Sequence, residues 1–211
     1  MEEEKLAVNV QHYFKKVGKF QLYDITFSLK EGYIMGLVGR MGSGKSTLLR
    51  CLIQGEIPGK AGNKGSIEIV GGVGAVTEEM PFLIDATLKE NAELYGSLYP
   101  DYDMELFQDY LRKIGLGSHL VYGLLSKGEK MKFQLAFAMS HQPKVLILDE
   151  PTAGLDVSFR GEFLRMIQEY VEVNMASVII STHMIEDLNK VADYIGYMEN
   201  GELVKMEERV R

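Results

Sequence analysis

One glycine-rich loop constrains the fold of this 211-residue chain more than any other feature. An almost continuous apolar run at residues 33–38 precedes it, typical of a strand buried on both faces, and a helix is predicted after it at residues 46–53. The loop consists of Gly39, Arg40, Met41, Gly42, Ser43, Gly44, Lys45 and Ser46. This order fits G-x-x-x-x-G-K-[ST] and predicts a phosphate-binding loop between strand and helix. A glycine-rich turn without a ligand is the alternative, and the strand–loop–helix context disfavours it.

The residue types in the loop indicate which ligand atoms they meet. Glycines let the backbone curl so that successive N–H groups point at phosphate oxygens, and the start of the helix adds a partial positive charge. Lys45 supplies a full charge to the β- and γ-phosphates, Ser46 offers a hydroxyl to Mg²⁺, and Thr47 reaches the α-phosphate. The sequence therefore predicts a nucleotide site with ATP and Mg²⁺ as the expected ligands.

Two adjacent acids end a second apolar run. Four apolar residues at 145–148 precede Asp149 and Glu150, and such a strand delivers carboxylates to the carboxyl edge of a sheet, where ligands bind. Neighbouring side chains on a strand point opposite ways. Asp149 is therefore expected to hold Mg²⁺ through water, and Glu150 to orient or deprotonate the water that attacks the γ-phosphate. A solvated strand end is the alternative for these acids taken alone.

The rest of the chain alternates between strand and helix patterns. Strands are predicted at residues 6–10, 20–29, 66–70, 145–148, 177–180, 194–198 and 202–206, with a turn near Gly18. Helices are predicted at residues 130–140, 160–171 and 184–192, and a mostly helical unit at 87–124. Alternation of this kind indicates an α/β fold with a mostly parallel sheet and helices on both faces.

Charge and hydropathy exclude several classes of protein. The net charge of −7 argues against a nucleic-acid partner, because such proteins usually show a basic footprint. The apolar runs are far shorter than the ~20 residues that a membrane-spanning helix needs. The acidic start at residues 1–5 lacks the apolar core of a signal peptide. The chain is therefore expected to be cytoplasmic and to reach a membrane only by docking.

Three further motifs follow in a fixed order. They occupy residues 125–129 (Leu-Ser-Lys-Gly-Glu), 148–156 (Leu-Asp-Glu-Pro-Thr-Ala-Gly-Leu-Asp) and 181–183 (Ser-Thr-His). With the phosphate loop, this order resembles the ATP-binding cassette (ABC) family across nearly the whole chain. The resemblance implies a single ABC ATPase domain at 1–211. Residues 1–86 and 125–211 would form a P-loop NTPase core with a small antiparallel β-subdomain, and residues 87–124 a helical subdomain.

The resemblance also implies roles for residues outside the loop. Ser126 and Gly128 fall in the family signature, which contacts the γ-phosphate of ATP bound to a second cassette. Asp156 falls in the loop that crosses the interface of the dimer. His183 matches the switch histidine that bonds the γ-phosphate, whereas the residue alone would suggest a cap for the helix predicted from Met184. Catalysis is thus assigned to Glu150, His183 and Lys45.

One role of the family is hard to place on the sequence. An aromatic side chain near the amino terminus stacks on adenine in this family, and either Tyr13 or Phe14 lies in the right region. Strand packing is the alternative for both residues. Cys51 is interpreted as a small core residue of the helix after the loop.

Three departures from the family pattern bear on turnover. Glu78 stands where the family usually has a glutamine; it can still ligate Mg²⁺, but it adds negative charge beside the phosphates. Lys127 replaces a signature glycine, and its charge can assist ATP binding to the partner cassette. The region at residues 55–74 is shorter than usual, which predicts a trimmed β-subdomain.

The expected function follows from the resemblance. It implies an ATP-hydrolysing subunit that pairs with an identical or different cassette and drives an integral membrane subunit from the inner face of the cell membrane. The run at residues 99–103 and the Leu-Ser-Lys-Gly signature resemble bacterial exporters of the ABC-2 type, so export is expected. A regulatory cassette without turnover and a soluble ABC ATPase unconnected with transport are the alternatives.

Overall fold

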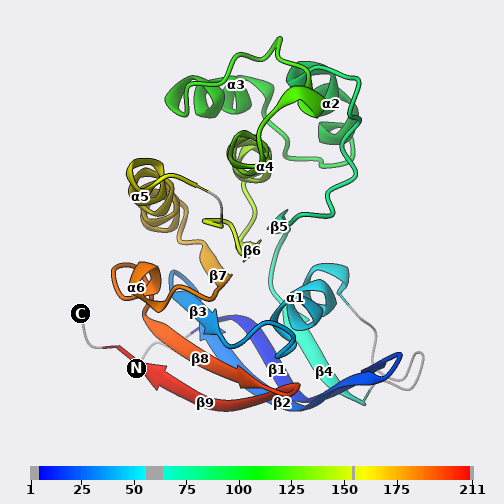
Figure 1. Cartoon of the computed structure of the whole chain (residues 1–211), viewed down its shortest axis with the longest axis vertical. Helices are drawn as coiled ribbons and strands as arrows, with labels where there is room; N and C mark the ends of the chain where they lie inside the picture. Colours follow the sequence, from blue (N-terminus) through cyan, green and yellow to red (C-terminus); the bar gives the residue numbers. More distant parts are fainter. Residues whose placement is uncertain (1–4, 56–63, 154, 210–211) are drawn as a thin grey trace.

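A mostly parallel sheet forms the centre of the molecule. The computed structural model describes residues 5–55, 64–153 and 155–209. The strand order is β5-β6-β7-β3-β8-β9 (Figure 1). These strands are β5 (Val73–Val76), β6 (Val145–Asp149), β7 (Ser177–Thr182), β3 (Ile34–Val38), β8 (Tyr194–Glu199) and β9 (Glu202–Glu208). Neighbours from β5 to β8 run parallel, and β9 returns antiparallel to β8, so the predicted mostly parallel sheet is confirmed.

Helices and a second sheet cover the two faces of the central sheet. The helices are α1 (Lys45–Gln54), α2 (Leu88–Gly96), α3 (Met104–Lys113), α4 (Lys127–Ser140), α5 (Val157–Asn174) and α6 (Ile185–Leu188), with a short 3₁₀ turn η2 (Tyr122–Leu124). Side chains of β3 alternate between two hydrophobic clusters. Ile34 joins α5, α6 and part of α4, whereas Met35 joins α1 and the second sheet. This is the period of two expected of a strand buried on both faces.

The second sheet is antiparallel and has the order β2-β1-β4. Its strands are β1 (Leu6–Val17), β2 (Phe20–Lys30) and β4 (Lys64–Ile69). The turn between β1 and β2 contains Gly18 at φ +61°, a conformation that favours glycine. The predicted strands and turn of this region are confirmed. The region at residues 55–74 was predicted to be trimmed. Residues 56–63 of this region lie outside the described residues.

The helical unit has a core of its own. α2, α3 and η2 contact one face of α4 through a cluster rich in aromatic side chains, including Phe82, Phe107 and Phe133 (Figure 1). The run at 99–103 contributes to this packing. The Tyr99 ring stacks on His141 with centroids 4.0 Å apart, and Asp103 caps α3 by accepting from the N–H groups of Glu105 and Leu106.

Four elements differ from the sequence prediction. The helix predicted at 184–192 is a single turn, α6, and β5 was not among the predicted strands. The helices predicted from 130 and 160 begin earlier, at Lys127 and Val157, because Ser126 and Asp156 cap them. In the part of the chain that the structure describes, no helix is long and apolar enough to cross a membrane.

Candidate nucleotide site

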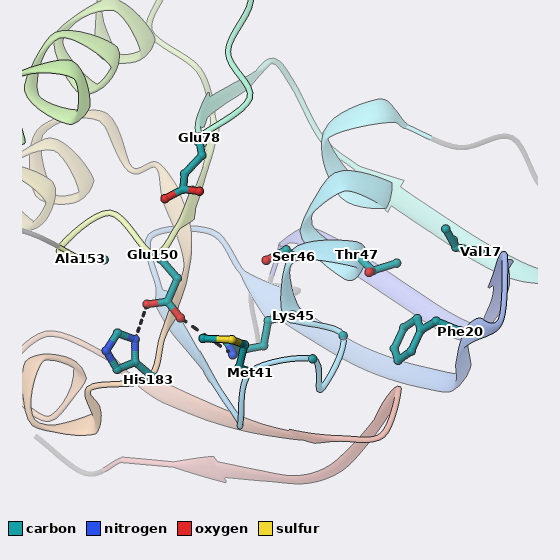
Figure 2. Close-up of a pocket in the computed structure, with 12 residues that line it drawn as sticks. Val17, Phe20, Met41, Lys45, Ser46, Thr47, Glu78, Glu150, Ala153 and His183 are labelled. Atoms are coloured by element: carbon teal, nitrogen blue, oxygen red, sulfur yellow. Dashed lines mark hydrogen bonds and ion pairs between the residues drawn. The ribbon is translucent and has the colours of Figure 1, made fainter. Parts of the chain in front are cut away.

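The three parallel strands β6, β7 and β3 are adjacent, so their carboxyl ends meet at one edge of the sheet. The phosphate loop follows β3, Glu150 follows β6 and His183 follows β7. A cavity of about 530 Å³ opens between these ends and α1 (Figure 2). The predicted site residues that line it are Met41, Gly42, Gly44, Lys45, Ser46, Thr47, Glu78, Glu150 and His183. Gly39, Arg40 and Ser43 line a neighbouring hollow on the other side of the loop.

Backbone carbonyl oxygens of the loop hold the Lys45 side chain in place. Its side chain is only 7% exposed, and its Nζ donates to the carbonyl oxygens of Gly39 (2.8 Å) and Arg40 (3.3 Å). The same Nζ lies 3.9 Å from Oε1 of Glu150. An ammonium group in this position faces the cavity with its charge only partly balanced. It is therefore suited to bind a multiply charged phosphate group.

The start of α1 adds further donors to the site. Gly44 precedes the helix at φ +109°, and a Cβ there would lie 2.8 Å from the Phe20 ring, so only glycine fits. Among the described residues no side chain caps α1, which leaves its first N–H groups for an anion. The buried Oγ of Ser43 also has no hydrogen-bond partner among the described residues. Buried polar groups are normally satisfied, so these donors fit a bound phosphate.

Asp149 and Glu150 point in different directions. Oδ1 of Asp149 accepts from Oγ of Ser181 at 2.5 Å, whereas Oε2 of Glu150 lies 2.8 Å from Nδ1 of His183 (Figure 2). Glu150 has φ +47°, in the left-handed region that non-glycine residues rarely adopt, and its N–H donates to Ser181. Backbone strain of this kind is concentrated at functional sites. Here it turns the carboxylate towards His183 and Lys45.

The oxygen ligands expected for Mg²⁺ gather beside the cavity. Ser46, Glu78 and Asp149, the predicted ligands, line an adjoining cavity of about 350 Å³ together with Glu150. In the described parts of the chain no group of three or more His, Cys, Asp or Glu side chains is placed to hold a metal alone. Mg²⁺ commonly takes one or two carboxylates and completes its shell with substrate phosphates and water. The donor set therefore fits Mg²⁺ bound together with a nucleotide.

The prediction of the adenine-stacking residue needs correction. Tyr13 is only 1% exposed because it packs in the cluster between β1, β2 and α1, where burial raises the pKa of its hydroxyl. Phe14 packs edge-to-face on Tyr23 at 6.1 Å. Of the described aromatic residues, Phe20 lines the cavity, and it follows directly on the Gly18–Lys19 turn (Figure 2). The sequence prediction did not consider Phe20, which lies on the far side of the turn from Tyr13 and Phe14.

The signature residues lie apart from the cavity. Ser126 caps α4: its Oγ donates to Oε2 of Glu129 (2.7 Å) and accepts from the Glu129 N–H (3.3 Å). The Ser126 hydroxyl and the Ser126 backbone N–H (2.8 Å) both donate to the Glu129 carboxylate and hold the pKa of that carboxyl below its usual range. Gly128 lies in the first turn, where an added Cβ would approach Leu155 to 3.0 Å. Neither Ser126 nor Gly128 lines the cavity that contains Lys45, so the structure does not bring the two half-sites together within one chain.

Comparison with known proteins places the chain in a family. The model of the family described as ABC transporter matches residues 22–153. The chain belongs to this family. A solved structure of the ATP-binding subunit of an ABC transporter has a TM-score of 0.83 at 23% identity, covering 96% of this chain and 90% of that one. The cassette is thus an ABC-type ATPase in family and fold.

Curated relatives extend beyond this cassette. The ABC transporter ATP-binding protein YtrB of Bacillus subtilis is 28% identical over 90% of this chain and 67% of its own length. The bacitracin transport ATP-binding protein BcrA of Bacillus licheniformis is 29% identical over 86% of this chain and 62% of its own length. The cassette therefore spans about two thirds of the length of these relatives. A dimeric ATP-binding cassette bound to ADP and Pi has a TM-score of 0.83 at 22% identity, covering 97% of this chain and 100% of that one.

Proposed function

We propose that this cassette binds and hydrolyses ATP at the interface with a second cassette and thereby drives transport through a separate membrane subunit. The observation that carries the proposal is the separation of two half-sites on one chain. The phosphate loop and Glu150 line one cavity, and the start of α4 at Ser126 lies outside it. Two chains placed head to tail supply both halves to each nucleotide. The neighbouring structure of a dimeric cassette with ADP and Pi supports this arrangement.

The chemistry is hydrolysis of the bond between the β–γ bridging oxygen and the γ-phosphorus. Oxygen of a water molecule attacks the γ-phosphorus, the bond to the bridging oxygen breaks, and a proton passes from the water to the Glu150 carboxylate. His183, 2.8 Å from that carboxylate, holds it and donates to the γ-phosphate. Lys45 and the α1 N–H groups balance the negative charge on the phosphates. Ser46, Glu78 and Asp149 would hold Mg²⁺, which would add positive charge beside the phosphates.

Mixed dimers test the composite site. We expect Lys45→Met, which damages the phosphate loop, and Ser126→Arg, which blocks the start of α4, each to abolish turnover when assayed alone. A mixture of the two variants forms dimers in which one of the two sites has an intact loop and an intact signature. Turnover in the mixture should recover to about a quarter of wild type. On random pairing half of the dimers contain one chain of each variant, and each of these mixed dimers has one intact site out of two. ATPase assays of the mixture make the measurement. A mixture as inactive as its components would contradict a site shared between chains.

Phe20 is proposed to stack on the adenine. An aromatic ring on a base contributes about 1–3 kcal/mol by alanine substitution in other systems. We therefore expect Phe20→Ala to weaken ATP binding by about 5- to 150-fold, measured by titration with a fluorescent ATP analogue. Phe14→Ala is the matched control and should leave affinity unchanged, since Phe14 packs on Tyr23 and does not line the cavity. Equal losses in both variants would count against the assignment.

The membrane partner is proposed to dock on the helical unit. Ile84 and Leu124 are exposed apolar residues that the backbone bond from Gly123 N–H to Ile84 O keeps close together. An apolar surface of this kind is suited to a protein partner.

We propose export as the direction of transport. The proposal is based on the run at residues 99–103 and on relatives named for bacitracin transport and linearmycin resistance. Relatives named for oligopeptide transport and methionine import also match, so reconstitution with the membrane subunit decides the direction.

One observation favours a second candidate, a regulatory cassette that binds ATP without turnover. Glu78 brings an additional carboxylate to a cavity that already contains Glu150. Negative charge beside the phosphates opposes the binding and reaction of ATP. Comparing the turnover of wild type with that of Glu150→Gln separates this candidate from the active ATPase.

A further inference from the structure

The two residues that depart most from the family pattern contact each other. Glu78 follows β5 in the connection that leads to the helical unit, and Lys127 is the first residue of α4. Although they are 49 positions apart, the Lys127 ammonium donates to Oε1 of Glu78 and forms an ion pair with it. The family glutamine and glycine at these positions could not form an ion pair. This contact is therefore a property of this chain's own substitutions.

α4 holds the same segment at a second point. Gln134 lies seven positions after Lys127, which places both residues on one face of α4. The buried Gln134 accepts from the Thr77 N–H at 3.0 Å through Oε1 and donates to the Tyr122 hydroxyl at 3.3 Å through Nε2. The backbone at 77 and the side chain at 78 are thus both fixed by α4. Glu78 is positioned by α4 rather than by the phosphate loop.

The charge of Glu78 needs compensation when ATP binds. Its carboxylate lines the cavity with Lys45, Ser46 and Glu150, and it lines the adjoining cavity with Asp149. Several carboxylates therefore surround the place proposed for a multiply charged triphosphate. Like charges a few ångströms apart repel, and the repulsion falls when one of them is paired with a cation. Lys127 is that cation for Glu78.

We propose that Lys127 is a positioning residue for the nucleotide site of its own chain, acting through Glu78; the inference rests on the proposed function. The ammonium keeps the Glu78 carboxylate on the α4 side of the cavity and offsets its charge, so that ATP meets less repulsion at Lys45 and Ser46. The same ammonium lies at the start of α4, where the phosphates of the partner cassette's ATP are proposed to bind. The ion pair therefore connects the two half-sites of one chain. With side chains 50% and 65% exposed, the pair is weak and sensitive to salt.

Nucleotide binding by the single chain tests this inference. A fluorescent non-hydrolysable ATP analogue is titrated into monomeric protein in EDTA, with light scattering to verify the monomer, so that no partner cassette contributes. We expect Lys127→Gln to weaken binding about three- to five-fold, in line with an exposed ion pair. Lys127→Arg keeps the charge and should stay within about two-fold of wild type. In a Glu78→Gln background Lys127→Gln should have no effect, and with Glu78 intact its effect should shrink as salt rises from about 50 to about 500 mM.

The outcomes separate this inference from the function on which it rests. Weakened binding with Glu78 intact, rescue by arginine and no effect in the Glu78→Gln background would support a role through Glu78. An equal loss in both backgrounds would overturn it, since Lys127 would then act independently of Glu78. Unchanged binding in Lys127→Gln would overturn it as well. A wild-type chain that binds no nucleotide would overturn the proposed function and the inference together, whereas normal wild-type binding leaves the proposed function standing.

Discussion

ATP turnover is expected to fall by about 100- to 10,000-fold in Glu150→Gln, the range associated with loss of a general base. Glutamine keeps the size of the side chain and its hydrogen bonding to His183, but it cannot take a proton from water. ATP affinity should be retained or slightly increased, because the substitution removes a negative charge 3.9 Å from the Lys45 ammonium. Steady-state phosphate release and equilibrium ATP binding provide the two measurements.

A second readout of Glu150→Gln concerns assembly. If hydrolysis separates two cassettes, the variant should accumulate as an ATP-bound dimer, detectable by size-exclusion chromatography with light scattering. Glu172→Gln is a matched control. Glu172 is exposed near the end of α5, and β7 begins shortly after it. Glu172 therefore lies at the amino ends of the strands, on the opposite edge of the sheet from Glu150. If wild type turns over ATP no faster than Glu150→Gln, even with the membrane subunit present, the alternative function of a regulatory cassette would be favoured.

Weaker ATP binding is expected in Lys45→Met. Charge-assisted hydrogen bonds contribute about 1.5–3 kcal/mol each, so removal of the ammonium should weaken ATP binding by about 10- to 150-fold. Methionine keeps a flexible apolar stem of similar length in the space that the Lys45 chain fills, so the fold should be preserved. Titration calorimetry gives the affinity directly.

Thermal unfolding separates binding from folding in this variant. ATP at 100 times its wild-type dissociation constant stabilises wild type by about 2.7 kcal/mol, and at the same ATP concentration this gain should fall to about 0.3–1.4 kcal/mol in Lys45→Met. Without ATP the two proteins should unfold at similar temperatures. Lys113→Met, on the exposed surface of α3, is the matched control and should retain the full ATP-dependent gain. A normal ATP-dependent gain in Lys45→Met would rule out the assigned role of the loop.

The parts of the site that local pattern determines could be predicted from the sequence. The loop at 39–46 and the acids at 149–150 each follow an apolar run whose burial on both faces fixes it as a central parallel strand. Once β3, β6 and β7 are adjacent, their carboxyl ends have to meet. The loop, Glu150 and His183 are therefore brought to one cavity by topology alone.

The features that were predicted wrongly or not at all depend on contacts between residues that are distant in the sequence. Tyr13 faces the core because the pairing of β1 with β2 shifts register on both sides of it, and such irregularities reverse which face a side chain occupies. The helix predicted at 184–192 stops after one turn, and Asp193 instead accepts from the Ile34 N–H at 2.8 Å. This bond joins the segment after α6 to the start of β3, a contact that helix propensity does not report. The ion pair between Glu78 and Lys127 joins segments whose proximity exists only in the folded chain.

The separate core of the helical unit gives it the mechanics of a rigid lever arm. α4 contributes Met131 and Leu135 to the core of the central sheet and Phe133 and Phe137 to the aromatic cluster beyond it. α2 and α3 are therefore mounted on α4 as one stiff body, since well-packed clusters resist deformation. A small tilt of α4 at its Lys127 end would then be magnified with distance along the arm. The far surface of the helical unit would move furthest, which converts a change of a few atoms at the phosphates into a displacement that another protein can follow.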